Sequence, residues 1–213
     1  MSPAKKTNNR QERTLIAIKP EAIQRHIVGE FISKFERRGL KLVACKLVAP
    51  TKEQVAEHYP DDEKWYVSSG TKTWQNYQDH GIDPGMTPVE LAKRTRRRLM
   101  EHLVDRPLLL MIWQGPHAIA LGRKTAGTTN PLAADIGSIR GDYSTESYEL
   151  ADDIERAIHT LVHASGSVKE AEKEIKIWFS LNEILDYDLV LEQVFYTKDW
   201  GRIKKEKREK RKD

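Results

Sequence analysis

The stretch from Thr160 to Phe179, T-L-V-H-A-S-G-S-V-K-E-A-E-K-E-I-K-I-W-F, decides how the rest of the chain is read. A short run of β-branched and apolar residues brings His163 to the edge of a Ser/Gly turn. A helix follows, because Ser167 and Glu170 have the S-x-x-E spacing of a capping box. The apolar residues of this helix recur at the spacing that places them on one face, namely Ala171, Ile175, Trp178 and Phe179.

The position of His163 suits an anionic group. Free backbone N–H groups and the helix dipole at a helix N-terminus attract phosphate. Glu174 lies two turns into the helix, where its carboxylate can turn back and fix the tautomer of the histidine, giving a nucleophile and a group that orients it. A histidine in a turn is more often structural or solvated, so this hypothesis depends on residues upstream.

Composition describes a polar, compact protein. The chain has 213 residues, 38% of them hydrophobic and 32% charged, which is enough for one large domain or two small ones. The single cysteine, Cys45, cannot form an internal disulfide, and we expect it in the core of a cytoplasmic protein. No apolar run has membrane-spanning length, and the N-terminal residues lack the apolar region of a signal peptide.

The net charge of +4 belongs to the C-terminal tail. Residues 203–213 carry seven Lys/Arg and three Asp/Glu, so the rest of the chain is neutral. We expect residues 201–213 to be a solvated basic tail, with nucleic-acid contact as the alternative. Residues 1–12 are polar and are expected to be disordered, which leaves 13–200 as one domain.

Short strands alternate with helices along this domain. Apolar runs predict strands over 13–19, 40–49, 107–114 and 160–162, and amphipathic patterns predict helices over 27–38, 51–59, 87–104, 117–124, 150–158 and 167–179. Residues 60–87 break the pattern and suggest an excursion with its own aromatic cluster, and 136–143 suggests a glycine-flanked loop carrying Arg140. The arginines at 94 and 96–98 are expected to form a solvated face or an oligomer contact. The element order predicts an α/β sandwich.

These segments resemble the nucleoside diphosphate kinase family. The matching motifs cover about residues 12–186 apart from the excursion, and they occur in the order of the family: R-T-L-I-A-I-K-P-E-A-I-Q-R at 13–25, V-G-E-F-I-S-K-F-E-R-R-G-L-K-L-V-A at 28–44, E-H-Y at 57–59, G-T-T-N-P at 127–131, G-S-I-R-G-D-Y at 137–143 and V-H-A-S-G-S-V-K-E-A-E-K-E-I at 162–175. The resemblance implies a ferredoxin-like βαββαβ sandwich (α+β) with a four-stranded antiparallel sheet covered by helices, an insertion near 60–94 and the basic tail. It also implies Mg²⁺-dependent transfer of a γ-phosphate from a nucleoside triphosphate to a nucleoside diphosphate through a phosphohistidine.

The residue types suit that chemistry, in which positioning and charge neutralisation dominate. The resemblance implies catalytic roles for His163 as nucleophile and for four residues around it: Lys19, Glu174, Ser165 and Tyr59. It implies nucleotide contacts for Lys19, Tyr59, Arg123, Thr129 and Arg140. Taken singly, each has a common structural explanation, such as a strand-end lysine or a surface arginine pair; together, in matched motifs, they favour function.

The chain departs from the family at several positions. Thr160 stands where the family has an asparagine that contacts the sugar, and Ala164 and Gly166 replace a glycine and an aspartate. We therefore expect no protein metal ligand, with Mg²⁺ carried mainly by the nucleotide phosphates. The stacking partner of the base is expected to be Trp65 or Tyr66, with broad base tolerance.

The insertion is expected to be a lid over the nucleotide or a subunit contact, and the protein a homo-oligomer, hexamer or tetramer. The rival hypothesis is a non-catalytic nucleotide or nucleic-acid binding protein on the same scaffold, motivated by the altered residues near His163 and by the tail.

Overall fold

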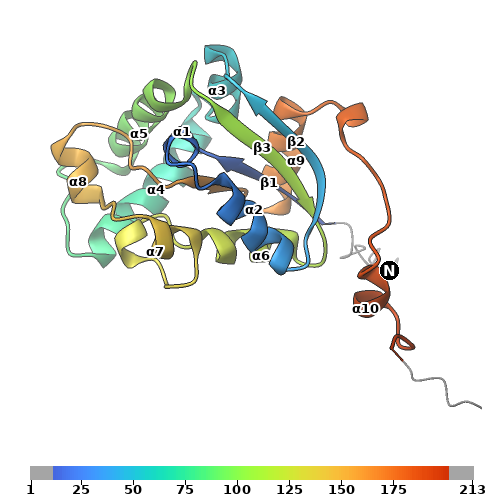
Figure 1. The fold of residues 1–213 in the computed structure, drawn as a ribbon. Helices are drawn as coiled ribbons and strands as arrows, with labels where there is room; N and C mark the ends of the chain where they lie inside the picture. Colours follow the sequence, from blue (N-terminus) through green and yellow to red (C-terminus); the bar gives the residue numbers. More distant parts are fainter. Residues whose placement is uncertain (1–11, 202–213) are drawn as a thin grey trace, which may run out of the picture.

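The computed structural model describes residues 12–201, which form a four-stranded sheet with helices on both faces (Figure 1). The strands are β1 (Arg13–Ile18), β2 (Lys41–Val48), β3 (Leu108–Gln114) and β4 (Val162–Ala164), in the order β2-β3-β1-β4. All neighbours are antiparallel, and Ala17 of β1 pairs with His163 of β4. The expected antiparallel ferredoxin-like sandwich is confirmed. The predictions for residues 1–11 and 202–213 lie outside the described residues.

The helices lie between and after the strands. Those before β3 are α1 (Pro20–Gln24), α2 (Val28–Arg37), α3 (Lys52–His58), α4 (Glu63–Asp79) and α5 (Pro88–Leu103). Those before β4 are α6 (Ala118–Ala126), η2 (Pro131–Ala133), α7 (Ile139–Tyr143) and α8 (Tyr148–Asp153), and those after it are α9 (Val168–Trp178), η3 (Leu181–Glu183) and α10 (Glu192–Tyr196). None of the described helices is long and apolar enough to cross a membrane.

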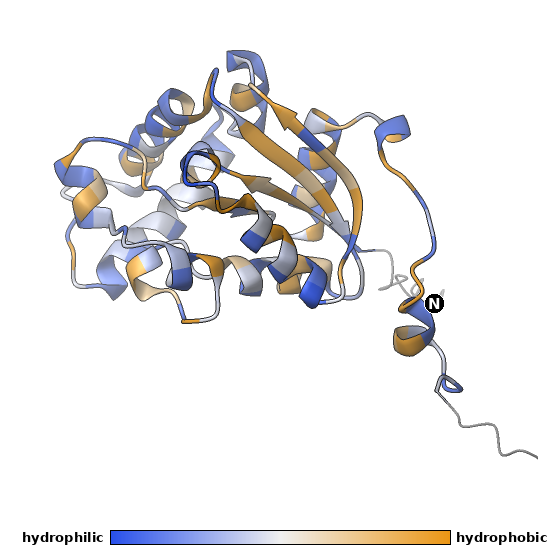
Figure 2. Ribbon diagram, in the orientation of Figure 1, coloured by the Kyte–Doolittle hydropathy of each residue, from blue (hydrophilic) through white to orange (hydrophobic). Residues whose placement is uncertain are grey.

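The central strand β1 contributes to two cores, one on each face of the sheet. Leu15 and Ala17 face the core that α9 covers, whereas Ile16 and Ile18 face the core that α2 and α6 cover. A strand buried on both faces has no polar alternation, which explains its continuous apolar run. Figure 2 shows the same feature, because the strands of the sheet carry most of the strongly apolar colour.

The expected irregular excursion contains a long helix, and this prediction was wrong. Asp62 caps α4 by accepting a hydrogen bond from the backbone N–H of Trp65, and the helix then packs along α5. Gly70 permits this close approach, because a Cβ there would lie 2.0 Å from the carbonyl oxygen of Pro88. The aromatic residues of 60–87 do not form one cluster either: Trp65 contacts Tyr66, whereas Tyr77 stacks on Tyr148 of α8, with ring centroids 4.4 Å apart.

Three of the four arginines in α5 are buried or half-buried against distant groups of the same chain, so the expected solvated face is also wrong. Arg94 and Arg98 both form ion pairs with Asp152 of α8, and Nε of Arg96 donates a hydrogen bond to the carbonyl of Tyr59. Arg97 alone among them is exposed to solvent. These contacts fasten the α4–α5 hairpin to the segment that leads to β4.

Other local predictions need correction. The helix expected over 150–158 ends at Asp153, because Glu155 has a φ of 54°, which is not helical. The side chains of Leu150 and Ile154, which were expected on its buried face, are exposed. The loop at 136–143 contains α7, whose first turn is capped by the Ser138 hydroxyl. Cys45 is exposed: a register shift between Leu42 and Ala44 in β2 turns Ala44 inward and Cys45 outward.

Candidate active site

His163 is the middle residue of β4 and faces the side of the sheet that α9 covers. Its neighbours Val162 and Ala164 point into the opposite core, so strand alternation alone directs the imidazole towards α9. Its Nε2 lies 3.1 Å from Oε1 of Glu174. The two atoms are in close electrostatic contact, although Nε2 has no partner with full hydrogen-bond geometry among the described residues. Nδ1 is the nitrogen left for an incoming group.

A buried serine holds the carboxylate of Glu174. The hydroxyl of Ser165 donates to Oε2 of Glu174 at 2.6 Å and accepts from the backbone N–H of Leu15 at 3.1 Å. Burial alone would raise the pKa of Glu174, but the contacts with His163, His58 and Ser165 outweigh it and lower that pKa to about 2. The pair therefore consists of an ionised carboxylate and an imidazole whose orientation it fixes.

The turn after His163 is only partly the expected capping box. Ser167 accepts a hydrogen bond from the backbone N–H of Glu170, as the spacing predicts. The Glu170 carboxylate accepts instead from the N–H of Gly166, at 2.9 Å. A Cβ at Gly166 would lie 2.6 Å from this carboxylate, so Glu170 occupies the space where a side chain at position 166 would start.

Lys19 follows β1 and lies beside Thr160. Its ammonium donates to Oγ1 of Thr160 at 2.8 Å, and the residue is 5% exposed. Burial lowers the pKa of Lys19 to about 8, with a further lowering by Arg140 and an opposing effect of Glu21. A lysine in this state is still mostly charged at neutral pH and sheds its proton more readily than a surface lysine.

Arg140 connects the segments around the site. Its guanidinium donates to the carbonyls of Thr160 at 3.1 Å, Val162 at 2.6 Å, Gly127 at 2.5 Å and Thr128 at 3.3 Å. Burial and the neighbouring Arg123 lower the pKa of Arg140 to about 10. The guanidinium thus brings positive charge to the site, and its hydrogen bonds to these four carbonyls hold the surrounding backbone in place.

The remaining predicted residues divide between two cavities. Lys19, Tyr59 and His163 line one cavity together with His58 and Trp178. Thr129 lines a second cavity, whose wall is formed mainly by residues of α4, α5 and α8 and includes Arg94, Arg98, Tyr148 and Asp152. The sequence therefore predicted residues that line each of the two cavities. It did not predict that residues of the insertion, in α4 and α5, line the second one.

Arg123 and the two candidate stacking residues line neither of these cavities. Arg123 is exposed and makes one long contact, 3.4 Å, to the carbonyl of Ala164. Tyr66 is buried, and its hydroxyl donates to Asp61 at 2.6 Å. Trp65 is half-buried and contacts the ring of Tyr59, with centroids 6.2 Å apart. Burial raises the pKa of Tyr59 above its usual range, so its hydroxyl stays protonated.

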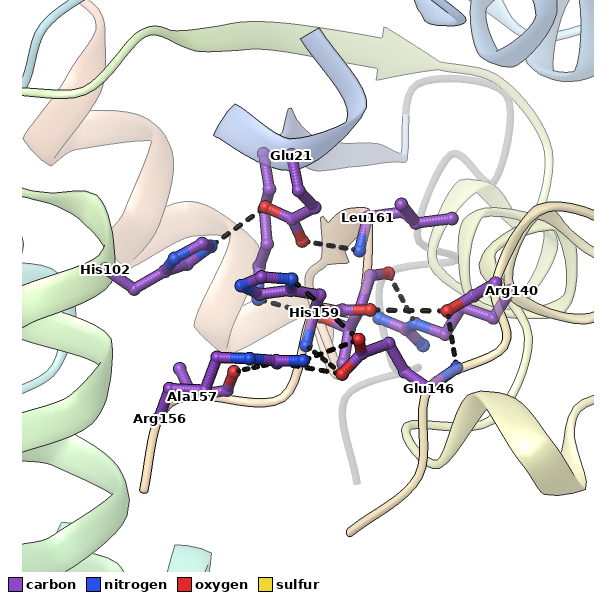
Figure 3. Close-up of polar contacts among 11 residues, drawn as sticks. Glu21, His102, Arg140, Glu146, Arg156, Ala157, His159 and Leu161 are labelled. Carbon is purple, nitrogen blue, oxygen red and sulfur yellow. Dashed lines mark hydrogen bonds and ion pairs between the residues drawn. The ribbon is translucent and has the colours of Figure 1, made fainter. Parts of the chain in front are cut away.

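Sequence reasoning missed Glu21, which holds the backbone next to Thr160 (Figure 3). Its carboxylate accepts from the N–H of Leu161 at 2.9 Å and contacts Nε2 of His102 at 2.8 Å. Leu161 has a φ of 64°, a conformation that costs a leucine about 1–2 kcal/mol. Burial opposes ionisation of Glu21, but His102 and Lys19 lower its pKa to about 2. The sequence feature that could have pointed to Glu21 is its place two residues after Lys19, in the K-P-E motif at 19–21.

Sequence reasoning also missed His58, which precedes Tyr59 in the quoted E-H-Y motif. The ring of His58 lies edge-to-face against that of His163, with centroids 4.8 Å apart. His58, His163 and Glu174 place two nitrogens and one oxygen within 4.8 Å of one another. Such a donor set suits Zn²⁺ better than Mg²⁺, which prefers oxygen ligands.

Comparison with known proteins points to one family. The family model described as "Nucleoside diphosphate kinase" matches residues 12–72 and 90–184. The residues between the two matches, 73–89, comprise the end of α4, the connection and the start of α5. They fall inside the insertion expected from the sequence.

Relatives and solved structures agree with this match. The chain is 42% identical to a nucleoside diphosphate kinase of Pyrobaculum aerophilum, over 82% of this chain and 98% of the relative, and 37% identical to one of Pyrococcus abyssi, over 89% and 97%. It resembles the crystal structure of an NDP kinase from Pyrobaculum aerophilum with a TM-score of 0.75 and 41% identity, covering 83% of this chain and 100% of that one. A transition-state mimic of nucleoside-diphosphate kinase from Borrelia burgdorferi, with bound vanadate and ADP, gives a TM-score of 0.71 at 29% identity, covering 85% and 95%.

Proposed function

Because the chain belongs to the nucleoside diphosphate kinase family and has that phosphotransferase activity, we propose that His163 is the residue that carries the phosphoryl group. The observation that supports this most directly is the arrangement behind the imidazole, where Nε2 faces the ionised Glu174 and Nδ1 is left free. A ring held in this way presents a lone pair to the substrate.

In the proposed first half-reaction, Nδ1 of His163 attacks the γ-phosphorus of a nucleoside triphosphate. The bond from that phosphorus to the bridging oxygen breaks, and the diphosphate leaves with the electron pair. The ring keeps its proton on Nε2 and becomes positively charged, and Glu174 stabilises that charge. In the second half-reaction, a terminal oxygen of another diphosphate attacks the phosphohistidine and restores the neutral ring, which makes the mechanism ping-pong.

The phosphates would meet a positive environment. We assign Lys19 and Arg140 as buried charges that favour the developing negative charge, and Arg123 as an exposed donor to phosphate oxygens. Thr129 and the hydroxyl of Tyr59 would donate further hydrogen bonds. Thr160 is assigned no direct bond to the sugar, because its hydroxyl accepts a hydrogen bond from Lys19. It would act on the nucleotide by positioning Lys19.

Trp65 is the better candidate to stack on the base. Tyr66 is buried and its hydroxyl is bonded to Asp61, whereas Trp65 is half-buried and lies against Tyr59. A stacking contact reads the π-face that every base has. We therefore expect comparable turnover with purine and pyrimidine diphosphates, to be measured in competition assays.

Mg²⁺ is proposed to arrive with the nucleotide, as is typical of the family. When bound, it would neutralise phosphate charge and orient the γ-phosphoryl group. The described residues fit this arrangement, because the two carboxylates nearest the site are already engaged: Glu174 contacts His163 and Ser165, and Glu21 contacts His102 and the N–H of Leu161. The Glu170 carboxylate occupies the side-chain space at Gly166, and it would supply negative charge there in place of the missing aspartate.

Assembly and location remain proposals based on family membership. We propose a homo-oligomer, hexamer or tetramer, in the cytoplasm. The insertion is proposed to form one wall of the nucleotide cleft, because α4, α5 and α8 line the cavity that includes Thr129.

The decisive experiment is phosphoryl labelling without acceptor. The protein is incubated with Mg²⁺ and γ-labelled ATP, and acid-labile, base-stable label is measured before and after a chase with a nucleoside diphosphate. We expect label on the wild type and on His80→Ala, an exposed control, but none on His163→Ala. Label that persists on His163→Ala would refute the assignment. A wild-type protein that binds nucleotide without becoming labelled would favour the non-catalytic alternative.

A further inference from the structure

His58 is a buried imidazole at the end of α3, and the mechanism above gives it no task. Its side chain is 6% exposed, and its ring lies against those of His163, 4.8 Å away, and Tyr59, 4.6 Å away. Both histidines can interact with the carboxylate of Glu174. A second imidazole in this position would disturb the reaction if it became protonated and drew that carboxylate away from His163.

Trp178 determines the tautomer of His58. The indole N–H of Trp178 lies 3.1 Å from Nδ1 of His58. Because an indole nitrogen can only donate, Nδ1 must be the accepting nitrogen, and the proton of the neutral ring must reside on Nε2. That Nε2 lies 3.9 Å from Oε1 of Glu174, the same oxygen that is 3.1 Å from Nε2 of His163.

The surroundings also keep His58 neutral. Burial lowers the pKa of His58 to about 3, the charges of His163, Lys19 and Lys173 act in the same direction, and Glu174 opposes them. A second proton would have to be placed on Nδ1, where it would face the indole N–H. The negative charge of Glu174 therefore remains available to His163.

We propose that His58 is a positioning residue: Trp178 keeps it as the neutral Nε2–H tautomer, and in that form it holds His163 and Glu174 in the orientation needed for phosphoryl transfer. The ring of His58 packs against that of His163 and limits its rotation, and its Nε2–H bond dipole favours the observed place of the Glu174 oxygen. The proposal rests on the proposed function, since His58 has this task only if His163 carries the phosphoryl group.

The first test replaces the ring of His58. We expect His58→Phe to lower the single-turnover rate of His163 phosphorylation by about 10–100-fold, the range for removing groups that orient metal-binding histidines, with the KM for nucleotide changed less than about twofold. His58→Gln, which can place an amide near the Nε2 position, should recover part of the rate, and His80→Phe serves as the exposed control. A wild-type rate in His58→Phe, or a loss that appears wholly in KM, would overturn the proposal.

The second test removes the tautomer lock. Trp178→Phe keeps an aromatic ring but has no N–H, and the smaller ring leaves room for water beside Nδ1 of His58. Both changes favour a proton on Nδ1 and move the pKa of His58 towards its ordinary value of about 6.5. Relative to wild type, the single-turnover rate should then fall as the pH drops from about 7.5 to 5.5. The double variant carrying His58→Phe as well should lack this additional fall, although His163, Glu174, Lys19 and Lys173 remain. If the rate of Trp178→Phe relative to wild type does not depend on pH, the claim that the Trp178 N–H keeps Nδ1 of His58 unprotonated is wrong.

The third test needs no turnover. In NMR of the full-length protein with ¹⁵N-labelled histidine, the His58 resonance, assigned by its loss in His58→Gln, should report an Nε2–H tautomer that does not titrate between pH 5.5 and 8. An Nδ1–H tautomer, or titration near pH 6.5, would overturn the proposal. A failure of the proposed function is distinguishable, because it would appear as absent label on wild-type protein whatever the state of His58.

Discussion

The carboxylate of Glu174 offers the sharpest quantitative prediction. Its pKa is about 2 against an ordinary value of 4.5, so its surroundings favour the charged form by about 3 kcal/mol at 1.36 kcal/mol per pH unit. Several contacts share this preference, among them those with His163 and Ser165. Glu174→Gln keeps the shape but removes the charge that stabilises the positively charged phosphohistidine. We therefore expect a loss of about 1.4–2.8 kcal/mol of transition-state stabilisation, or 10–100-fold in rate.

The assay is the single-turnover formation of labelled phosphohistidine at saturating Mg²⁺-ATP. Glu172→Gln is the matched control, because Glu172 lies on the same helix but is exposed. Circular dichroism establishes that both variants are folded. A Glu174→Gln rate within about threefold of wild type would refute the role of the charge, as would an equal loss in Glu172→Gln.

The same group makes a prediction about stability and pH. Its folded-state pKa lies below its unfolded value, so its contribution is present above about pH 4.5 and is lost as the pH falls towards 2. Urea unfolding between pH 6 and 3 should therefore show a smaller acid-dependent loss for Glu174→Gln than for wild type. Parallel curves for the two proteins would contradict this reasoning.

Three further predictions concern other parts of the molecule. The pKa of Lys19 is about 8, so kcat/KM should fall as the pH rises through 8 to 10, because the neutral amine binds phosphate weakly; a flat profile over this range would contradict its role. Asp152→Ala should lower the free energy of unfolding in urea by about 2 kcal/mol, because Arg98 is 9% exposed and would lose its carboxylate partner; an unchanged value would mean that the ion pair is unimportant. Gly127→Ala should cost more than about 2 kcal/mol in the same assay, since φ is 88° and the new Cβ would lie 2.5 Å from the Ser138 hydroxyl; a cost below 1 kcal/mol would show that the loop adapts.

Local patterns in the sequence were sufficient for most of the scaffold. The apolar run of β1 predicted a strand buried on both faces, and the spacing of Ala171, Ile175 and Trp178 predicted the buried face of α9. The helices expected to start at residues 51 and 87 do so, each with a capping box, formed by Thr51 with Gln54 and by Thr87 with Glu90. These features depend on interactions within a few residues, which a single sequence records.

Elements that depend on distant partners were missed. The helix α4 has no strong apolar face of its own, and it is stabilised by close packing on α5 at Gly70 and by the stacking of Tyr77 on Tyr148. Arg98 resembles a surface residue in sequence, but Asp152, far away in the chain, pairs with it. Cys45 was misplaced because a register shift in β2 changes which side chains face inward.

The sequence by itself determined the family motifs, the order of strands and helices, and the identity of His163 and Glu174 as a candidate pair, because these follow from residue type and short spacings. Only the tertiary structure decided which nitrogen of His163 faces the carboxylate, that Glu21 holds Leu161, and that Trp178 reaches the ring of His58. The contact of Trp178 with His58 joins side chains 120 positions apart, and the contact of Glu21 with the N–H of Leu161 joins residues 140 positions apart. These contacts, and the approach of Glu174 to His163 between α9 and β4, exist only once the sheet and its helices have assembled.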